Sequence, residues 1–539
     1  MQPAIIRGQI SFFALLMSVP REIELKLEVP PRSIGRLARS AVLNGTTAAP
    51  RKPATLVSVY FDTKKLKLRK HGLSLRVRHV GRRNVQTIKQ DGGEGTTLLA
   101  RNEWEQEING RRPDIDAAQD TALEPLIGKK LRRGLLPLFK TRVRRKVYPI
   151  RHRESEIELT IDQGKIEAGS RSSSLCEVEL ELKHGEPADL FAAARELSRE
   201  VPVQLALTSK AERGYSLVTG KAPGPIKAAP VVLAPQVSCQ AAFRVIARAC
   251  LRQLIANKPV TLRGDAEGLH QMRVALRRLR AAISLFGDML ADRQTDEMKH
   301  KFKWITGELG PAREIDVFIN HVLTPVARNK PDGAGMAVLT KDLQQKREQA
   351  FARARAALAS SRFRSLMIET AAWIETGDWT SNADDQVNAL REEAIAVLAA
   401  HELGRRWKKI LKKGARLKEL EPRDRHKLRI QVKKLRYASE FFADAFTGRK
   451  AGRRREDFLA SLEGLQDALG DLNDIMVHEG LTRSIADTAP EGRRHPTGRT
   501  RKAFAAGRLS GREEARTESV LKDMQRAYAV FAKAKPYWA

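Results

Sequence analysis

The feature that most constrains this chain is a strict two-residue alternation of charged and apolar side chains in residues 21–29, REIELKLEV. Residues 176–183, CEVELELK, repeat the pattern. Successive side chains of a β-strand point to opposite faces. Each segment therefore predicts a strand with one apolar face and one face that carries three carboxylates and a lysine. A single strand of this kind is typical of an ordinary amphipathic sheet, but the recurrence indicates that carboxylates gather on a common face.

Further alternating segments fill the region between these two strands, among them LVSVYFDT (56–63), LSLRVRHV (73–80) and SEIELTID (155–162). With one helix near 189–200, they predict a mainly antiparallel sheet or barrel. Residues 92–95, GGEG, lie between two strand-like segments with no helix following, so they predict a hairpin turn and not a phosphate-binding loop.

A change of pattern divides the chain into domains. Residues 220–235, GKAPGPIKAAPVVLAP, are rich in Pro and Ala and indicate a linker. After them the apolar residues recur with a helical period. We predict a multidomain α+β protein. The expected parts are an extension at 1–16, a strand-rich domain at 17–220, a linker at 221–236 and an all-α domain at 237–539.

The composition indicates which binding partners and which cellular compartment to expect. The formal net charge is +34, spread along the whole chain, which favours polyanions such as nucleic acid, anionic lipid or polyphosphate. Only 5% of the residues are aromatic, so base-stacking platforms are scarce. The apolar run at 9–19 is too short to span a bilayer and lacks a cleavage pattern, so we expect translation to begin at Met17. Three cysteines without metal-ligand spacing indicate a reducing compartment, and we expect a cytoplasmic protein without a membrane partner.

The polar strand faces combine two kinds of charge. Carboxylates that lie close together repel one another unless cations lie among them, and carboxylate clusters are typical sites for Mg²⁺ or Mn²⁺. Arg76 and Arg78 share one strand face, and guanidinium groups at this spacing can bind a row of phosphate oxygens. Acids for metal and bases for phosphate together suit phosphoryl transfer.

The first domain resembles the CYTH, or triphosphate tunnel metalloenzyme, family. EIELKLE matches its ExExK signature, and further motifs follow in the family's order. These are YFDT (60–63), LRVR (75–78), TIK (87–89), RNEWE (101–105), EIELTIDQG (156–164), CEVELELK and TSKAERGY (208–215). The resemblance implies an eight-stranded antiparallel barrel with flanking helices, whose lumen is the active site.

The same resemblance implies roles for individual residues. The expected ligands of Mg²⁺ or Mn²⁺ are Glu22, Glu24, Asp162, Glu177 and Glu179. The expected triphosphate contacts are Lys26, Arg76, Arg78, Lys89, Arg101, Arg145 and Lys210, and Glu103 is expected beside them in the tunnel. The expected catalytic residues are Glu24, Lys26, Arg76 and Arg78.

Members of this family hydrolyse inorganic triphosphate, thiamine triphosphate or RNA 5′-triphosphates, or cyclise ATP. Inorganic triphosphate needs only the lattice of charges, so we favour metal-dependent hydrolysis of this substrate to diphosphate and phosphate. Thiamine triphosphatase or cyclase activity stays an alternative. A different class of function, a non-enzymatic scaffold that binds polyphosphate or nucleic acid, is the second alternative.

The helical half contains an internal repeat, HQMRVALRRLR (270–280) and HKLRIQVKKLR (426–436). At 100° per residue, the matching basic positions form one stripe on each helix. The two stripes consist of His270, Arg273, Arg277 and Arg280, and of His426, Arg429, Lys433 and Arg436. A second pair, ELGPAREIDV (308–317) and ALGDLNDIMV (468–477), adds Arg313 in the first copy and has Asn473 instead in the second. Two related helical bundles, about 237–380 and 385–539, are therefore expected.

This half resembles the CHAD family over residues 237–538, and the chain end KAKPYW also fits. The resemblance implies binding of long-chain polyphosphate by the eight stripe residues and Arg313, with imidazoles that gain charge beside phosphate. Polyphosphate is favoured over nucleic acid, and association with polyphosphate granules would follow. Residues 404–413, GRRWKKILKK, place Arg405, Lys408, Lys409 and Lys412 on another face, which we predict to be a solvated helix surface.

Overall fold

The computed structural model describes residues 21–47, 51–81, 83–90, 100–220, 224–329, 333–487 and 496–538. The chain divides into two compact units. Unit 1 consists of Met1–Gly224 and Ser361–Thr376, and unit 2 consists of Pro225–Ser360 and Gly377–Ala539. The helix Ser361–Thr376, which lies within the domain expected at 237–539, is thus grouped with the first unit. The expected extension at 1–16 lies outside the described residues.

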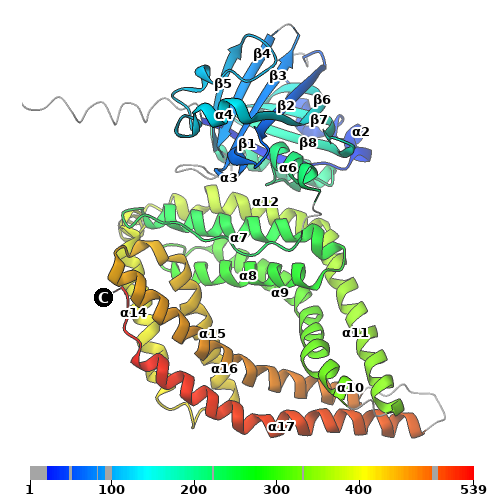
Figure 1. Cartoon of the computed structure of the whole chain (residues 1–539), viewed down its shortest axis with the longest axis vertical. Coiled ribbons are helices and arrows are strands. Elements are labelled where there is room, and N and C mark those ends of the chain that lie inside the picture. Colours follow the sequence, from blue (N-terminus) through cyan, green and yellow to red (C-terminus); the bar gives the residue numbers. More distant parts are fainter. Residues whose placement is uncertain are drawn as a thin grey trace, which may run out of the picture. The chain divides into compact units, whose positions relative to one another are not determined.

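Unit 1 is built on one antiparallel sheet (Figure 1). Its strands are β1 (Arg21–Glu28), β2 (Ala54–Thr63), β3 (Leu73–Val80), β4 (Arg83–Gln90), β5 (Ala100–Ile108), β6 (Leu135–His152), β7 (Ser155–Ala168), β8 (Arg171–His184) and β9 (Gln204–Leu205). They are ordered β5-β4-β3-β2-β6-β7-β8-β1-β9. The alternating segments of the sequence fall within these strands, except that Val29 follows the last residue of β1.

The prediction of an eight-stranded barrel is confirmed only as an antiparallel sheet, because the sheet has nine strands. The additional strand, β9, has two residues and pairs with the end of β1, so it is too short to show an alternation. Strand β5 pairs in addition with β1, but only from Arg21↔Asn102 to Ile23↔Ala100. The two sides of the sheet therefore meet over a short stretch, and we describe a curled sheet and not a closed barrel.

Helices pack against the sheet and against one another. Those of unit 1 are α2 (Ile34–Leu37), α3 (Lys67–Lys70), α4 (Lys129–Gly134), α5 (Pro187–Glu200), α6 (Lys210–Thr219) and α12 (Ser361–Thr376). Leu25 and Leu27 of β1 are 1% and 0% exposed, whereas the side chain of Lys26 between them lies on the polar face. Helix α5 buries Leu190 and Phe191 and contacts both β1 and α12. The alternation in residues 21–29 thus directs the apolar side chains into the core and the charged side chains to the opposite face of the sheet.

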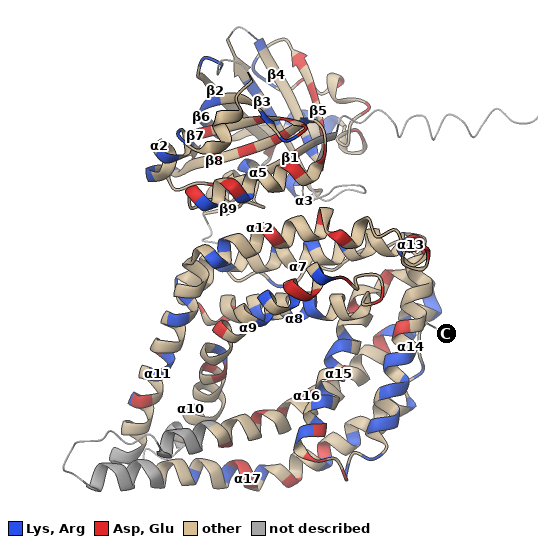
Figure 2. Ribbon diagram, turned by 180° about the vertical axis from the view of Figure 1, so that it is seen from behind, with Lys and Arg blue, Asp and Glu red and all other residues tan. Residues whose placement is uncertain are grey.

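Unit 2 is helical, as predicted. Its helices are α7 (Cys239–Leu262), α8 (Ala266–Leu285), α9 (Arg293–Phe318), α10 (Thr324–Asn329), α11 (Gly333–Ala359), α13 (Asp385–Glu392), α14 (Ile395–Gly414), α15 (Pro422–Phe441), α16 (Arg449–Asp487) and α17 (Pro496–Lys533). The first copy of the repeated motif lies on α8 and the second on α15, and these two helices contact each other. Lys and Arg follow α14 and α15 along their length (Figure 2). None of the helices in the described part of the chain combines the length and the apolar character that crossing a membrane requires.

Candidate functional site

Charged side chains from six strands and one helix of unit 1 line a common cavity, which we call the charged pocket. Its lining residues are Glu24, Lys26, Tyr60, Ser74, Arg76, Arg78, Lys89, Glu103, Glu105, Arg145, Glu179, Glu181, Ser209, Lys210 and Ala211. Six are cations and five are carboxylates. The pocket therefore has both signs of charge in close contact, as expected from the sequence.

Strand register brings these groups together. Residues directly opposite one another on neighbouring strands point to the same face. Lys26 lies opposite Glu179 across β1 and β8, and Arg145 lies opposite Asp162 across β6 and β7. Lys89 of β4 lies opposite Glu103 of β5. Each pair combines a cation with a carboxylate, so the register itself sets the pattern of charge.

Helix α6 adds Lys210 at its first position. Ser209 caps the helix by accepting a hydrogen bond from the Glu212 backbone N–H, and the Glu212 carboxylate accepts from the Ser209 N–H. This capping box fixes where the helix begins. Gly214, one turn further on, lies against the Phe139 ring of β6, where an added Cβ would come within 2.0 Å of a ring carbon. The close approach of α6 to the sheet therefore depends on a glycine.

Three buried carboxylates form a cluster beneath Lys210. Oxygens of Asp162, Glu177 and Glu179 all lie within 4.8 Å of one another. The Lys210 Nζ lies 2.9 Å from Asp162 Oδ2 and 2.8 Å from Glu179 Oε1, and it also pairs with Glu177. Arg145 Nη2 lies 2.7 Å from Asp162 Oδ2 and 2.9 Å from Glu179 Oε2. Lys26 Nζ lies 3.3 Å from Glu179 Oε1, so three protein cations neutralise the cluster in this structure.

The pKa values follow from this arrangement. Burial acts to raise the pKa of Glu179, but Lys210, Lys26 and Arg145 outweigh it and hold the pKa well below its usual range. For Glu177, burial is the largest effect and the pKa is raised. The cluster therefore offers carboxylate oxygens, the donors that hard divalent cations such as Mg²⁺ and Mn²⁺ prefer. The chemistry of the donor set fits the expected metal.

The opposite wall of the pocket is cationic. Arg76 is buried and donates to Glu103 Oε1 at 3.3 Å and to Glu105 Oε1 at 3.4 Å. Lys89 also pairs with Glu103. Arg78 has no ion pair within the described part of the chain, and its Nε is buried without a hydrogen-bond partner. Repulsion from Arg76, followed by burial, lowers the pKa of Arg78 to about 10.

Most of the residues predicted for this site are brought together. Nine of them line the charged pocket, and Asp162 and Glu177 lie against it through Lys210. Glu22 and Arg101 pair through their backbones in β1 and β5, but their side chains lie outside the described part of the structure. Sequence reasoning missed Tyr60, Ser74, Glu105, Glu181 and Ser209 as lining residues. The alternation in RNEWE and CEVELELK could have indicated Glu105 and Glu181.

In unit 2 the two basic stripes meet in a groove of about 670 Å³, the stripe groove, which α8, α9 and α15 line together. Arg277 and Arg280 of the first copy and Lys433 of the second line it. None of these three has an ion pair among the residues that the structure describes. Burial, then Arg429 and Arg277, lowers the pKa of Lys433 to about 7. The groove therefore holds a surplus of positive charge.

The remaining stripe residues lie outside this groove, and several are paired. Arg436 Nε lies 3.0 Å from Glu440 Oε1, and Arg429 Nη2 lies 3.8 Å from Asp474 Oδ1. Arg273 Nη2 lies 4.0 Å from Glu314 Oε1. These three stripe cations are thus partly neutralised by acidic residues of the same unit.

The histidines of the two copies have comparable neighbours. His426 Nδ1 lies 2.5 Å from Asn473 Oδ1, and Arg313, at the matching place in the first copy, is close enough to His270 to affect its titration. Burial, with Arg313 next, lowers the pKa of His270 to about 4. The imidazole of His270 is therefore neutral near pH 7 in this structure, so any gain of charge there would need a bound anion. The second repeated motif, at 308–317 and 468–477, thus places a polar residue beside the histidine in both copies.

Comparisons with known proteins agree with this division. A CYTH domain model matches residues 20–215, and a CHAD domain model matches residues 245–483. The inorganic triphosphatase of Haemophilus influenzae is 32% identical over 198 residues, which cover 36% of this chain and 55% of that protein. The chain thus spans about half the length of this curated relative.

Two solved structures are also similar. The CHAD domain from the plant Ricinus communis is 26% identical, covers 58% of this chain and 98% of that chain, and has a TM-score of 0.49. A Hippeastrum protein with a dominant triphosphatase activity is 21% identical, covers 37% of this chain and 97% of that chain, and has a TM-score of 0.27.

Proposed function

We propose that unit 1 hydrolyses inorganic triphosphate with a divalent metal ion and that unit 2 binds long-chain inorganic polyphosphate, in keeping with the CYTH and CHAD domain models that match the chain. The named relative, an inorganic triphosphatase, supports a phosphoanhydride substrate for unit 1. The basic groove of unit 2 supports a polyanionic ligand of the same chemistry.

The main support for triphosphate as the ligand of unit 1 is the environment of Arg78. Its guanidinium lies in the charged pocket beside Arg76, without an acidic partner within the described residues and with a buried, unpartnered Nε. An unpaired buried cation is unfavourable, and a multiply charged anion between the two guanidiniums would remove the penalty. We assign Lys26, Arg76, Arg78 and Lys89 to the phosphate oxygens.

The acidic wall has the complementary role. Glu24, Asp162, Glu177 and Glu179, with Glu22, would hold the metal ion, which when bound supplies Lewis-acid polarisation of the phosphate oxygens. The residues of the chain hold the phosphoanhydride in place and stabilise the charge that develops on the leaving diphosphate. Arg76 is suited to this second role, because Glu103 and Glu105 hold its side chain in one position.

The pocket lining favours inorganic triphosphate over thiamine triphosphate and ATP. Tyr60 is the aromatic residue among the lining residues, and it is only 4% exposed. Its ring is stacked on Phe139 at 4.5 Å between centroids. It therefore does not present a face on which a purine or a thiazolium ring could stack. A substrate made of phosphate alone needs no such surface.

The test is a phosphate-release assay on the full chain with triphosphate, ATP and thiamine triphosphate offered side by side. We expect release from triphosphate with Mg²⁺ or Mn²⁺ and loss of release with a chelator. A faster reaction with either organic triphosphate would overturn the substrate assignment. No release from any of the three would favour the alternative of a non-enzymatic binding protein.

For unit 2, the test is gel retardation with long-chain polyphosphate and with duplex DNA at matched salt. Both ligands gain affinity from counterion release, so their ratio at one ionic strength is the informative quantity. We expect polyphosphate to be retained more tightly. Tighter retention of DNA would contradict the proposal for unit 2 and leave that for unit 1 intact.

A further inference from the structure

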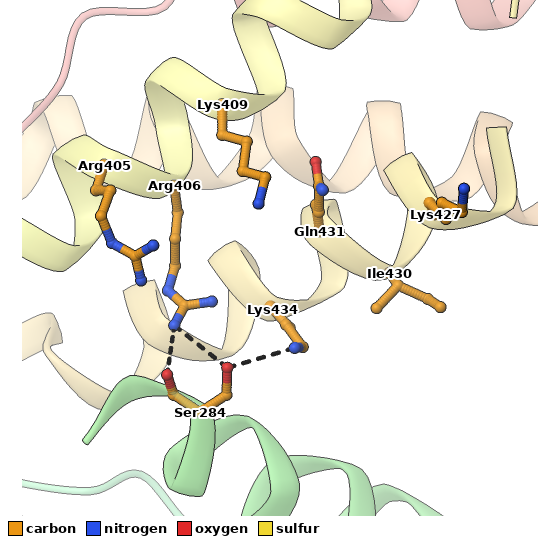
Figure 3. A pocket seen from close by; sticks show the side chains of 8 residues that line it. All are labelled: Ser284, Arg405, Arg406, Lys409, Lys427, Ile430, Gln431 and Lys434. Carbon is orange, nitrogen blue, oxygen red and sulfur yellow. Dashed lines mark hydrogen bonds between the residues drawn. The ribbon is translucent and has the colours of Figure 1, made fainter. Parts of the chain in front are cut away.

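A second basic cavity in unit 2 lies beside the stripe groove, between the end of α8 and the facing sides of α14 and α15 (Figure 3). We call it the α14 pocket, and its volume is about 320 Å³. Five cations line it, namely Arg405, Arg406, Lys409, Lys427 and Lys434. The sequence predicted a solvated face at 404–413. Its side chains at 405, 408, 409 and 412 are indeed exposed, but Arg405 and Lys409 turn out to border this cavity.

Part of the pocket is held in a fixed arrangement. The side chain of Arg406 is 12% exposed, and its Nε lies 3.0 Å from Glu402 Oε2. Its Nη2 donates to the Ser284 carbonyl oxygen at 2.8 Å. Lys434 Nζ lies 3.3 Å from the Ser284 Oγ on the same wall (Figure 3). A receptor whose cations are already positioned loses little conformational freedom when an anion binds.

The pocket has more positive charge than its neighbours neutralise. Glu402 pairs with both Arg405 and Arg406, and Asp424 pairs with Lys427 at 2.8 Å. Lys409 and Lys434 have no ion pair among the residues that the structure describes. Burial, then Arg406, lowers the pKa of Lys434. The cations therefore repel one another, and an anion in the cavity would relieve that repulsion.

The lining indicates which anion fits. None of its eight residues is aromatic, and Ile430 is the one apolar side chain among them. A nucleobase or a lipid chain would therefore find little surface to contact. Arginine forks and lysine ammonium groups match phosphate oxygens. The α14 pocket also shares Ser284, Ile430 and Lys434 with the stripe groove, so the two cavities adjoin.

We infer that the α14 pocket binds a short inorganic oligophosphate, as the terminal segment of a chain whose remainder lies in the stripe groove. A terminal phosphate carries more negative charge than an internal one, because it can lose a second proton. The α14 pocket is the smaller of the two adjoining cavities, about 320 Å³ against about 670 Å³, so it suits the short, highly charged end of a chain, and the larger groove suits the remainder. The continuation into the stripe groove rests on the proposed polyphosphate binding, whereas the pocket itself rests on its own residues.

Acetylation of lysines in the full chain, read by mass spectrometry, tests the inference one residue at a time. The probes are orthophosphate, pyrophosphate, tripolyphosphate, long-chain polyphosphate and a single-stranded oligonucleotide, at equal phosphate. At a ligand concentration about tenfold above Kd, we expect pyrophosphate and tripolyphosphate to slow labelling of Lys409 and Lys434 about tenfold. Lys408 and Lys412 are internal controls, because they lie on the same helix, are exposed and do not line the pocket.

The outcomes separate this inference from the proposed function. Equal protection of Lys408 and Lys409 would mean diffuse screening and would overturn the site, as would stronger protection by the oligonucleotide. Lys434 lines both cavities, so Lys409 and Lys433 separate them. Protection of Lys433 by polyphosphate with Lys409 unchanged would reject the α14 pocket and support the stripe groove. Protection of Lys409 with Lys433 unchanged would reject binding in the groove and support the pocket.

A pair of double variants provides an independent measurement. Lys409→Gln with Lys434→Gln should weaken pyrophosphate binding by calorimetry at least about tenfold, since two unpaired cations are lost. Lys408→Gln with Lys412→Gln removes the same charge from the same part of the molecule and should change the affinity less than about twofold. Similar losses in both variants would show that net charge, and not the pocket, determines binding.

Discussion

The ammonium group of Lys210 lies 2.9 Å from Asp162 Oδ2, inside the group of three carboxylates that is best suited to a divalent cation. A metal ion held by these oxygens, as proposed, would therefore compete with a cation of the protein. Its binding would require Lys210 to move away from Asp162, Glu177 and Glu179. This relationship makes the affinity for metal depend on a residue that is not itself a ligand.

Lys210→Gln should raise the affinity for Mn²⁺ about tenfold, because the competing charge is removed while the carboxylates remain. In the presence of a chelator the same variant should unfold at a lower temperature than the wild type. The reason is that the buried carboxylates lose one of the cations that balance their negative charge. Calorimetric titration with Mn²⁺ measures the first effect and thermal unfolding the second. Lys64→Gln, at an exposed position of unit 1, is the control. An unchanged Mn²⁺ affinity in Lys210→Gln would contradict the competition.

Glu24→Gln should lower metal-dependent phosphate release at least about 100-fold, as expected when a group that orients or binds the metal is lost. The Glu24 carboxylate lies 2.9 Å from Lys26 Nζ, so the substitution also weakens this contact, while the contact of Lys26 with Glu179 at 3.3 Å remains. Glu28→Gln on the same strand is the matched control, because Glu28 is half exposed and does not line the charged pocket. Retained activity in Glu24→Gln, with normal circular dichroism, would remove Glu24 from the proposed metal site.

Arg78→Met and Arg76→Met should have opposite effects on stability. Arg78 has no acidic partner within the described residues and is repelled by Arg76, so its loss should leave the free energy of unfolding unchanged or raise it. Arg76→Met leaves Glu103 without one of its buried partners and should destabilise by about 3 kcal/mol. Both variants should raise KM for triphosphate. Denaturant titration in the absence of phosphate separates the two, and a large loss of stability in Arg78→Met would argue against an anion-binding role.

Polyphosphate binding by unit 2 should weaken as the pH rises above 7. Lys433 has a pKa of about 7 in the free protein, and a bound anion favours its charged form, so binding takes up a proton above that pH. The lowered pKa of Lys433 also makes the folding stability depend on pH. Because the folded pKa lies below the ordinary value of 10.5, the unfolded chain binds more protons between about pH 7 and 10.5, and stability should increase with pH across that window.

Affinity for long-chain polyphosphate, measured from pH 6 to pH 9 at constant ionic strength, checks this prediction. Lys433→Arg should keep its affinity at pH 9, because a guanidinium stays charged. Lys433→Met should bind more weakly at pH 6 and lose most of the pH dependence. A wild-type affinity that is constant over the range would show that Lys433 does not contact the ligand.

The alternation in residues 21–29 and 176–183 was enough to predict β1, β8 and the charged face that they share, because side-chain direction in a strand follows from position alone. Register could not be derived in the same way, since it depends on how distant strands pair. The opposition of Lys26 and Glu179 is therefore a finding of the structure. The same limit applies to the α14 pocket, because the internal repeat relates α8 to α15 but no pattern in the sequence places Arg406 of α14 beside Ser284 and Lys434.

The close contact of Gly214 with Phe139 leads to a final prediction about how α6 positions Lys210. A Cβ at residue 214 would lie 2.0 Å from the Phe139 ring, and that ring is itself fixed by stacking on Tyr60. Gly214→Ala must therefore displace α6 from the sheet, which should cost about 1–3 kcal/mol of unfolding free energy. Lys210 lies four residues earlier on this helix, so its contacts with the carboxylates should loosen together with the packing.

Gly35→Ala is the control, because an added Cβ there meets nothing within 4 Å. It should leave stability unchanged or raise it by about 0.5–1 kcal/mol, as expected for alanine in place of glycine in a helix. The informative measurement combines denaturant unfolding with Mn²⁺ titration. If Gly214→Ala loses stability but keeps the wild-type Mn²⁺ affinity, then the position of α6 does not control access to the carboxylates. A change in both the unfolding free energy and the Mn²⁺ affinity would show that the packing of Gly214 against the sheet controls how Lys210 interacts with the carboxylates.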